Sequence, residues 1–168
     1  RALPATANWT LQTELSYDAK RTGSHFTGLQ VDILEGSTLT RYFFGSENGT
    51  HIAAKRGTTI FNSPLNLYTP GTAHLLSDVG ATIRFRRVGA SLFFERRVNG
   101  VWSTIYTRAL TGGAAAVAQN GGIYVATTIA ENLRVAFDYV ILSDAANVSS
   151  PLSNLRITEM MYAPKAPD

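Results

Sequence analysis

Two consecutive β-hairpin turns, between residues 83 and 107, constrain the fold more than any other feature of the chain. Gly89-Ala90 separates residues 83–88 from 91–98, and a glycine at the first of two central positions suits a type II′ turn. Asn99-Gly100 then leads into residues 101–107, and Asn-Gly favours a type I′ turn because both positions need positive φ. Two-residue loops would set the register of all three strands and assign each side chain to a face.

On this register one face is apolar and the other combines arginines with aromatic residues. The apolar face, expected in the core, carries Ile83, Phe85, Leu92, Phe94, Val98, Val101 and Ile105. The second face carries Arg84, Arg86, Phe93, Glu95, Arg97, Trp102 and Tyr106. The expected opposite pairs are Arg84 with Glu95, Arg86 with Phe93, Arg97 with Trp102, and Phe93 with Tyr106. This second face has the chemistry of a sugar-binding surface, but ion pairs and cation–π contacts also stabilise an ordinary exposed sheet.

The rest of the chain also alternates as β-strands do. Strands are expected at residues 8–17, 25–33, 38–44, 51–56, 65–68, 121–126 and 133–142, with a long loop over most of residues 57–80 and no convincing helix. This spacing predicts an all-β fold, a two-sheet antiparallel β-sandwich of the jelly-roll kind. The predicted core contains Ile83, Phe85, Leu92, Phe94, Ile105, Val135, Phe137 and Tyr139, with Trp9 and Tyr17 on an apolar stripe.

Length and composition indicate the number of domains and argue against several classes of protein. The 168 residues fit one main domain, predicted at 1–142, followed by a linker at 143–153 and a C-terminal extension at 154–168. No apolar run approaches the roughly 20 residues of a membrane span. The net charge of +3 is too mild to predict nucleic-acid binding. The chain has no cysteine and does not begin with Met, so we expect a mature or excised piece without disulfides.

Several segments together resemble a known family. These are Gly28-Leu29-Gln30-Val31, the segment IRFRRVGASLFFERRVNGVWSTIYT, then GGIYVATT and VAFDYVIL. Over residues 9–142 they resemble the bacterial concanavalin A-like, laminin-G-like jelly-roll domains, which are appended to secreted glycoside hydrolases and other surface proteins. LRITEMMYAP resembles the first strand of bacterial lamin-tail domains. The resemblance implies a secreted or cell-surface multidomain protein, with neighbouring domains of the same chain as partners.

The carboxylates and histidines argue against catalysis. Jelly-roll glycoside hydrolases carry paired carboxylates, but no predicted strand has two of the 12 acidic residues on one face. Glu95 stands among arginines, which would lower its pKa and suit it to an ion pair. The three histidines, His25, His51 and His74, are too scattered to predict a zinc site. No cofactor is expected, although a structural calcium ion near Asp18, Glu131, Asn132 and Asp144 is left open.

The sequence therefore favours a non-catalytic carbohydrate-binding or adhesion module. Its polysaccharide ligand would stack on aromatic rings and accept or donate hydrogen bonds at polar side chains. The candidate site residues are Trp102, Tyr106, Arg84, Arg86, Glu95, Arg97, Gln30, Asp32 and Asp138. The alternatives are a structural spacer domain that binds no glycan and, if carboxylates from different strands converge, a jelly-roll glycoside hydrolase.

Overall fold

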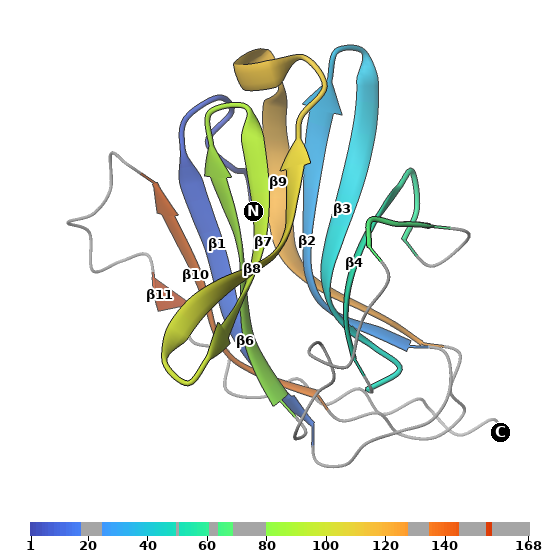
Figure 1. Ribbon diagram of the computed structural model, residues 1–168, viewed down its shortest axis with the longest axis vertical. Coiled ribbons are helices and arrows are strands. Elements are labelled where there is room, and N and C mark those ends of the chain that lie inside the picture. The colour runs from blue at the N-terminus through green and yellow to red at the C-terminus, as the bar shows by residue number, and fades with distance from the viewer. Residues whose placement is uncertain are drawn as a thin grey trace, which may run out of the picture.

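The computed structural model describes residues 1–17, 25–49, 51–60, 64–68, 80–127, 135–144 and 154–155. Their strands form two antiparallel sheets packed face to face (Figure 1). One sheet has the order β11-β10-β1-β6-β7-β8 and the other the order β5-β4-β3-β2-β9. This architecture confirms the predicted all-β, two-sheet antiparallel β-sandwich.

The strand bounds follow the alternating pattern of the sequence. The six-stranded sheet contains β1 (Trp9–Tyr17), β6 (Gly80–Val88), β7 (Ser91–Val98), β8 (Val101–Ala109), β10 (Val135–Asp144) and β11 (Asn154–Leu155). The five-stranded sheet contains β2 (His25–Glu35), β3 (Thr38–Glu47), β4 (His51–Gly57), β5 (Leu65–Asn66) and β9 (Val117–Thr127). The one helical element in the described residues is a 3-10 turn, Gly113–Ala115.

The core lies between the two sheets and is built from the inward residues of each strand. Leu11 and Leu15 on β1 face inward, as do Leu29, Val31 and Ile33 on β2. An aromatic cluster occupies the centre, where Phe44 and Phe85 come from opposite sheets with ring centroids 6.0 Å apart. Most of the predicted core is confirmed as buried: Ile83, Phe85, Leu92, Phe94, Val135 and Phe137, together with Trp9. The side chain of Tyr17 lies outside the described part.

The two predicted hairpin turns are confirmed. Asn99 and Gly100 have φ values of 50° and 81°, as a type I′ turn requires, and Val98 is paired with Val101. Gly89 has a positive φ of 54° at the first central position of the other turn. Three predicted opposite pairs are therefore present: Arg84 with Glu95, Arg86 with Phe93, and Arg97 with Trp102.

The fourth predicted pair, Phe93 with Tyr106, is absent because the β7–β8 pair contains a β-bulge. The register shifts between Phe94 and Glu95, so Glu95 is opposite Thr104 and Phe94 is opposite Tyr106. Phe93 consequently faces Thr107 rather than Tyr106. An extra residue in one strand reverses the faces of the side chains beyond it, so Tyr106 packs against the core instead of lying beside Trp102.

A second bulge moves Tyr139 out of the predicted core. The β1–β10 register shifts between Glu14 and Leu15, so inward Leu15 pairs with Phe137 but outward Glu14 pairs with Tyr139. Tyr139 accordingly leaves the predicted core, and its hydroxyl accepts a hydrogen bond of 2.9 Å from the amide of Gln12. Strand alternation alone places residues 137 and 139 on one face, and the bulge separates them.

Two further residues of the predicted apolar face are not in the core. Val98 is 45% exposed and Val101 is 69% exposed, because the β7–β8 turn projects to the side of the sandwich rather than under the facing sheet (Figure 1). Ile105 is partly buried and packs against the core. The alternation of a strand predicts the direction of a side chain, but burial also needs a facing sheet.

The Asn99-Gly100 turn provides a test of the register. Gly100→Val places a β-branched residue at φ 81°, which should lower the free energy of unfolding by about 1–3 kcal/mol. Urea denaturation measures this loss. Asn99→Gly is the control, because glycine adopts positive φ without strain, and it should change stability by less than about 0.5 kcal/mol. Equal stability of the Gly100→Val variant and the unmodified protein would contradict the type I′ geometry.

Candidate functional site

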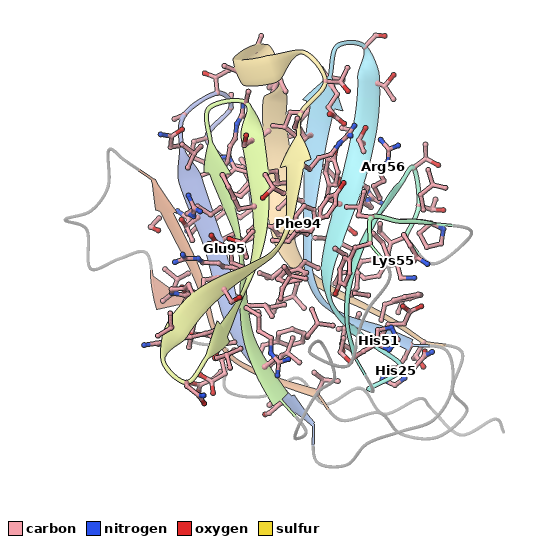
Figure 2. The ribbon with its side chains drawn as sticks, in the orientation of Figure 1. His25, His51, Lys55, Arg56, Phe94 and Glu95 are labelled. Atoms are coloured by element: carbon pink, nitrogen blue, oxygen red, sulfur yellow. The ribbon has the colours of Figure 1, made fainter. Side chains whose placement is uncertain are left out.

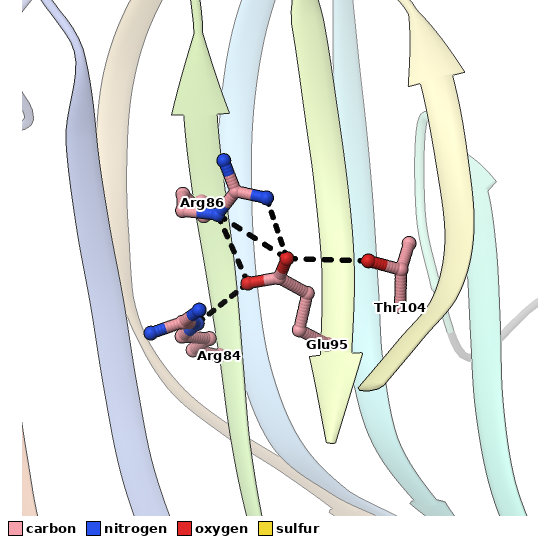
Figure 3. A network of polar contacts seen from close by, with 4 residues as sticks. All are labelled: Arg84, Arg86, Glu95 and Thr104. Carbon is pink, nitrogen blue, oxygen red and sulfur yellow. Dashed lines mark hydrogen bonds and ion pairs between the residues drawn. The ribbon is translucent and has the colours of Figure 1, made fainter. Parts of the chain in front are cut away.

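The outer face of β6, β7 and β8 carries a network of polar side chains centred on Glu95 (Figure 3). Glu95 is 3% exposed. Arg84 Nε donates to its Oε2 at 2.6 Å, and Arg86 Nη2 donates to Oε1 at 2.6 Å while Arg86 Nε lies 3.1 Å from Oε2. The hydroxyl of Thr104 donates to Oε1 at 3.3 Å. One carboxylate therefore holds two guanidinium groups in place.

Each of these guanidinium groups also lies over an aromatic ring. The Cζ atom of Arg84 is 4.0 Å from the ring centroid of Trp102, and that of Arg86 is 4.1 Å from the centroid of Phe93. Both distances are in the range of cation–π stacking. Both arginines come from β6, Glu95 and Phe93 from β7, and Trp102 from β8. Each guanidinium group therefore contacts the carboxylate of Glu95 and one aromatic ring. This arrangement fixes the arginine side chains from two directions.

The electrostatics of Glu95 suit it to ion pairing. Burial opposes its ionisation, but hydrogen bonds and the positive charges of Arg86 and Arg84 outweigh burial and hold the pKa of Glu95 below its ordinary value. A carboxyl with a lowered pKa is deprotonated at neutral pH and has no proton to give to a leaving group. The prediction that the arginines lower its pKa is confirmed.

The structure divides the predicted site residues among four places, three of them in the six-stranded sheet. Arg84, Arg86, Glu95 and Trp102 are brought together, and Arg97 lies opposite Trp102 with its Nε donating to the carbonyl oxygen of Gly100 at 3.0 Å. Tyr106 faces the core, where its ring meets that of Phe94 edge-on at 5.6 Å. Asp138 is exposed on β10, two strands away from β6 in the same sheet.

Gln30 and Asp32 do not belong to this network, because β2 lies in the other sheet. Asp32 forms a bidentate ion pair with Arg41 on β3, with distances of 2.8 and 3.1 Å, and the amide of Gln30 donates to Asp32 at 3.3 Å. Alternation correctly places both side chains outward. The prediction that they would join the arginine face is wrong because it depended on the order of strands in the sheets.

The five-stranded sheet carries a second polar cluster that the sequence analysis did not find. Lys55 on β4 pairs with Glu47 at 2.9 Å and donates to the side chain of Asn66 at 2.7 Å, and His51 lies 3.1 Å from the same carboxylate. Figure 2 shows Lys55 and His51 on the side of the molecule opposite to Glu95. The buried Lys55 ammonium also lies 5.1 Å from the ring of Phe26. The cluster joins three strands and contributes to the packing of this face.

Arg87 is an inward-facing arginine whose role the sequence analysis also missed. Its side chain is fully buried, and burial lowers its pKa. The guanidinium donates to the carbonyl oxygens of Ala5 at 2.7 Å, Ala116 at 2.6 Å and Ala114 at 3.1 Å, and its Nε donates to that of Gly89 at 3.2 Å. It therefore links the N-terminal segment, a hairpin turn and the 3-10 turn. Its place after Ile83 and Phe85 on the inward side of β6 was the available signal.

The residues near which a structural calcium ion is left open lie largely outside the described residues. Asp18, Glu131 and Asn132 fall in ranges that the structure does not describe, and of Asp144 only the backbone is described. Within the described ranges, no three histidine or acidic side chains cluster as metal ligands would. The structural calcium ion stays an untested alternative to the expectation of no cofactor. His74 also falls outside these ranges, as do the linker residues 145–153 and residues 156–168.

Comparison with known proteins supports the fold. No family model and no curated protein matches the chain. Among solved structures it is similar to a functionally unknown protein from Saccharomyces cerevisiae, at a TM-score of 0.53 and 12% identity, over 85% of this chain and 72% of that one. It is also similar to the CBM2 module of an evolved Dit protein from Lactobacillus casei BL23 phage J-1, at a TM-score of 0.48 and 10% identity, over 80% and 63% of the two chains. The first likeness supports the β-sandwich.

Among the residues that the structure describes, none forms a helix long and apolar enough to cross a bilayer.

The ion pairs of Glu95 predict a pH-dependent contribution to stability. Because its folded-state pKa is lowered, Glu95 stabilises the fold above the ordinary glutamate pKa of about 4.3, and this contribution is lost as the pH falls towards the folded-state value. At pH 7, Glu95→Gln should lower the free energy of unfolding by about 1–3 kcal/mol. Denaturation at pH 7 and pH 3 should show the difference shrinking in acid. A difference that stays constant would contradict the assignment.

Proposed function

We propose that the chain is a non-catalytic glycan-binding module and that the outer face of β6, β7 and β8 is its binding surface. The observation that carries the proposal is the Arg84–Glu95–Arg86 network, in which hydrogen-bond donors are held between a buried carboxylate and two aromatic rings. Sugar hydroxyls are bound by donors of fixed direction beside an aromatic surface. Pre-organised side chains also lose less conformational entropy when a ligand binds.

In the structure, the arginines rather than the aromatic rings are the first groups that a sugar would contact. Arg84 stacks on Trp102, so that face of the indole is occupied by a guanidinium group. Tyr106 faces the core and adds no second ring. In the proposed mode, Arg84 and Arg86 donate to ring hydroxyls, while Trp102 orients Arg84 and offers its remaining surface to the pyranose.

The proposal does not include hydrolysis. A retaining or inverting glycosidase needs a carboxylic acid with a raised pKa near a second carboxylate, whereas Glu95 has a lowered pKa and is held by two arginines. Turnover of a β-glucan or xylan that disappears in a Glu95→Gln variant would contradict this part.

The resemblance to jelly-roll domains of secreted proteins further supports an exported bacterial multidomain protein as the context.

The second candidate is a structural spacer that binds no glycan. The observation in its favour is the same network, because two arginines that are already paired with Glu95 and stacked on rings also stabilise a sheet surface without a ligand. The two functions predict different effects on glycan binding when a residue of this surface is substituted.

Trp102→Ala separates the two functions. If the surface binds glycan, the variant should lose retention in affinity electrophoresis on a polysaccharide that retains the unmodified protein, because a stacking contact contributes about 1–3 kcal/mol, by analogy with stacking on bases. Circular dichroism should show an intact fold, since Trp102 is only partly buried.

Val101→Ala is the matched control, because Val101 precedes Trp102 on β8 and is 69% exposed. It should leave retention unchanged. Absence of retention on every polysaccharide of a broad panel would favour the spacer. Unfolding of the Trp102→Ala variant would remove the proposed site, since it would mean that the ring belongs to the packing of the domain.

A further inference from the structure

The outer face of β6, β7 and β8 has an excess of positive charge. It carries three arginines, Arg84, Arg86 and Arg97, and one carboxylate, Glu95, so its net charge is 3 − 1 = +2. The outward carboxylate of Glu14 lies on the neighbouring strand β1, opposite Thr82. No ion pair joins Glu14 to these arginines among the described residues. Glu95 therefore neutralises only part of the positive charge of these arginines.

The arginines also keep hydrogen-bond donors that Glu95 does not use. Arg84 contacts Glu95 through Nε, and Arg86 does so through Nε and Nη2. Within the described part of the chain, Nη1 and Nη2 of Arg84 and Nη1 of Arg86 have no hydrogen-bond partner. The side chain of Arg86 is 32% exposed and that of Arg84 19% exposed, so these donors are open to solvent.

The spacing and orientation of these donors suit a carboxylate. Arg84 and Arg86 are two residues apart on one strand, about 6–7 Å along it. Stacking on Trp102 and Phe93 restricts the planes of both guanidinium groups. A planar guanidinium binds a carboxylate through two parallel N–H bonds, and Arg86 already binds Glu95 through two nitrogens. A second carboxylate from outside would find two unused nitrogens, Nη1 and Nη2, on Arg84 and one, Nη1, on Arg86.

We propose that the ligand of this surface is an acidic polysaccharide whose sugars are uronic acids. The inference rests on the proposed glycan-binding function and adds the class of ligand. Each uronic acid combines a pyranose ring, which contacts the exposed part of Trp102, with a carboxylate, which accepts from Arg84 or Arg86. Charge complementarity favours this ligand over a neutral glycan, and the binding is sensitive to salt because the surface is exposed.

Polygalacturonate and its fully methyl-esterified form provide the test, because they share a backbone and differ in charge. In affinity electrophoresis, the protein should be retained about tenfold more strongly by polygalacturonate than by the ester. Arg84→Gln and Arg86→Gln should each weaken retention by polygalacturonate about tenfold. Retention should fall steeply at 1 M salt, where the Debye length is about 3 Å.

Arg41→Gln is the matched control. Arg41 is also 32% exposed and also forms a bidentate pair with a carboxylate on the next strand, but it lies on the other sheet. The substitution removes the same charge and should leave retention unchanged. If Arg41→Gln weakens retention as much as Arg86→Gln, binding follows net charge alone and the inference is overturned.

Four other outcomes also overturn the inference, and they show whether the proposed glycan-binding function falls with it. Equal retention by the acid and the ester, or retention by neutral polysaccharides only, would leave a glycan-binding module without the preference for uronic acids. No retention by polygalacturonate, alginate or any neutral polysaccharide would remove both proposals. Single-stranded DNA bound as tightly as polygalacturonate, with the same dependence on Arg86, would show a general polyanion surface instead.

Discussion

Phe94→Ala is expected to lower the free energy of unfolding by about 3–5 kcal/mol. Phe94 is fully buried, and its ring meets four others edge-on: Phe85 at 4.9 Å, Phe44 and Tyr106 at 5.6 Å, and Tyr42 at 6.1 Å. These rings come from both sheets, so the cavity left by alanine lies where the sheets are joined. Urea denaturation should show a lower midpoint with an unchanged slope.

Phe93→Ala is the control for this prediction. Phe93 is the preceding residue on β7 but faces outward, where its ring lies under Arg86. Figure 2 shows Phe94 directed between the sheets, whereas Glu95, on the same face as Phe93, lies on the outside. Truncating Phe93 should cost about 1 kcal/mol or less. Equal losses for the two variants would mean that β7 has slipped by one residue.

Arg87→Ala is expected to cost about 3–5 kcal/mol, because it opens a cavity in place of a fully buried side chain and removes the guanidinium donor from the buried hydrogen bond to Ala116. The oxygens of Ala5, Ala114 and Ala116 each lose a bond to the guanidinium. Backbone hydrogen bonds to β9, from Leu3 N–H to Gln119 and from Ala118 N–H to Ala5, also hold the N-terminal segment. Because Arg87 adds the link between this segment and the 3-10 turn, we expect amide hydrogen exchange to increase in both.

Arg97→Ala is the matched control for Arg87→Ala. In both residues Nε donates to the carbonyl oxygen of a hairpin glycine, Gly89 for Arg87 and Gly100 for Arg97. Arg97 is exposed, so water replaces its hydrogen bond and the loss should stay within about 0.5 kcal/mol. A loss for Arg87→Ala as small as that of Arg97→Ala would show that water or other donors replace the guanidinium at these carbonyl groups.

Much of the arginine network was predictable from the sequence because its geometry is local. The Asn99-Gly100 and Gly89-Ala90 turns determine the register of adjacent strands, and that register places Arg84 opposite Glu95 and Trp102 opposite Arg97. The same local argument, with the charges of neighbouring arginines, correctly predicted the direction of the pKa shift of Glu95.

The prediction of the site residues is wrong where it depended on a β-bulge or on the position of a strand far away in the sequence. The bulge at Phe94 and Glu95 turns Tyr106 inward, and no residue in this segment signals the bulge. Gln30 and Asp32 were expected beside the arginines, but β2 pairs with β3 and β9 in the opposite sheet. Adjacent strands of a hairpin are linked by their turn, whereas the order of strands in two sheets depends on how the whole core packs.

The all-β class, the two hairpins and the inward or outward direction of most side chains could be predicted without the structure, since turn chemistry and the two-residue period of a strand act over a few residues. The assignment of each strand to a sheet, the positions of the bulges and the hydrogen bonds of Arg87 to the carbonyl oxygens of Ala5 and Ala116 depend on the fold as a whole. These features bring together residues that are far apart in the chain, and their stability comes from burying both sheets at once.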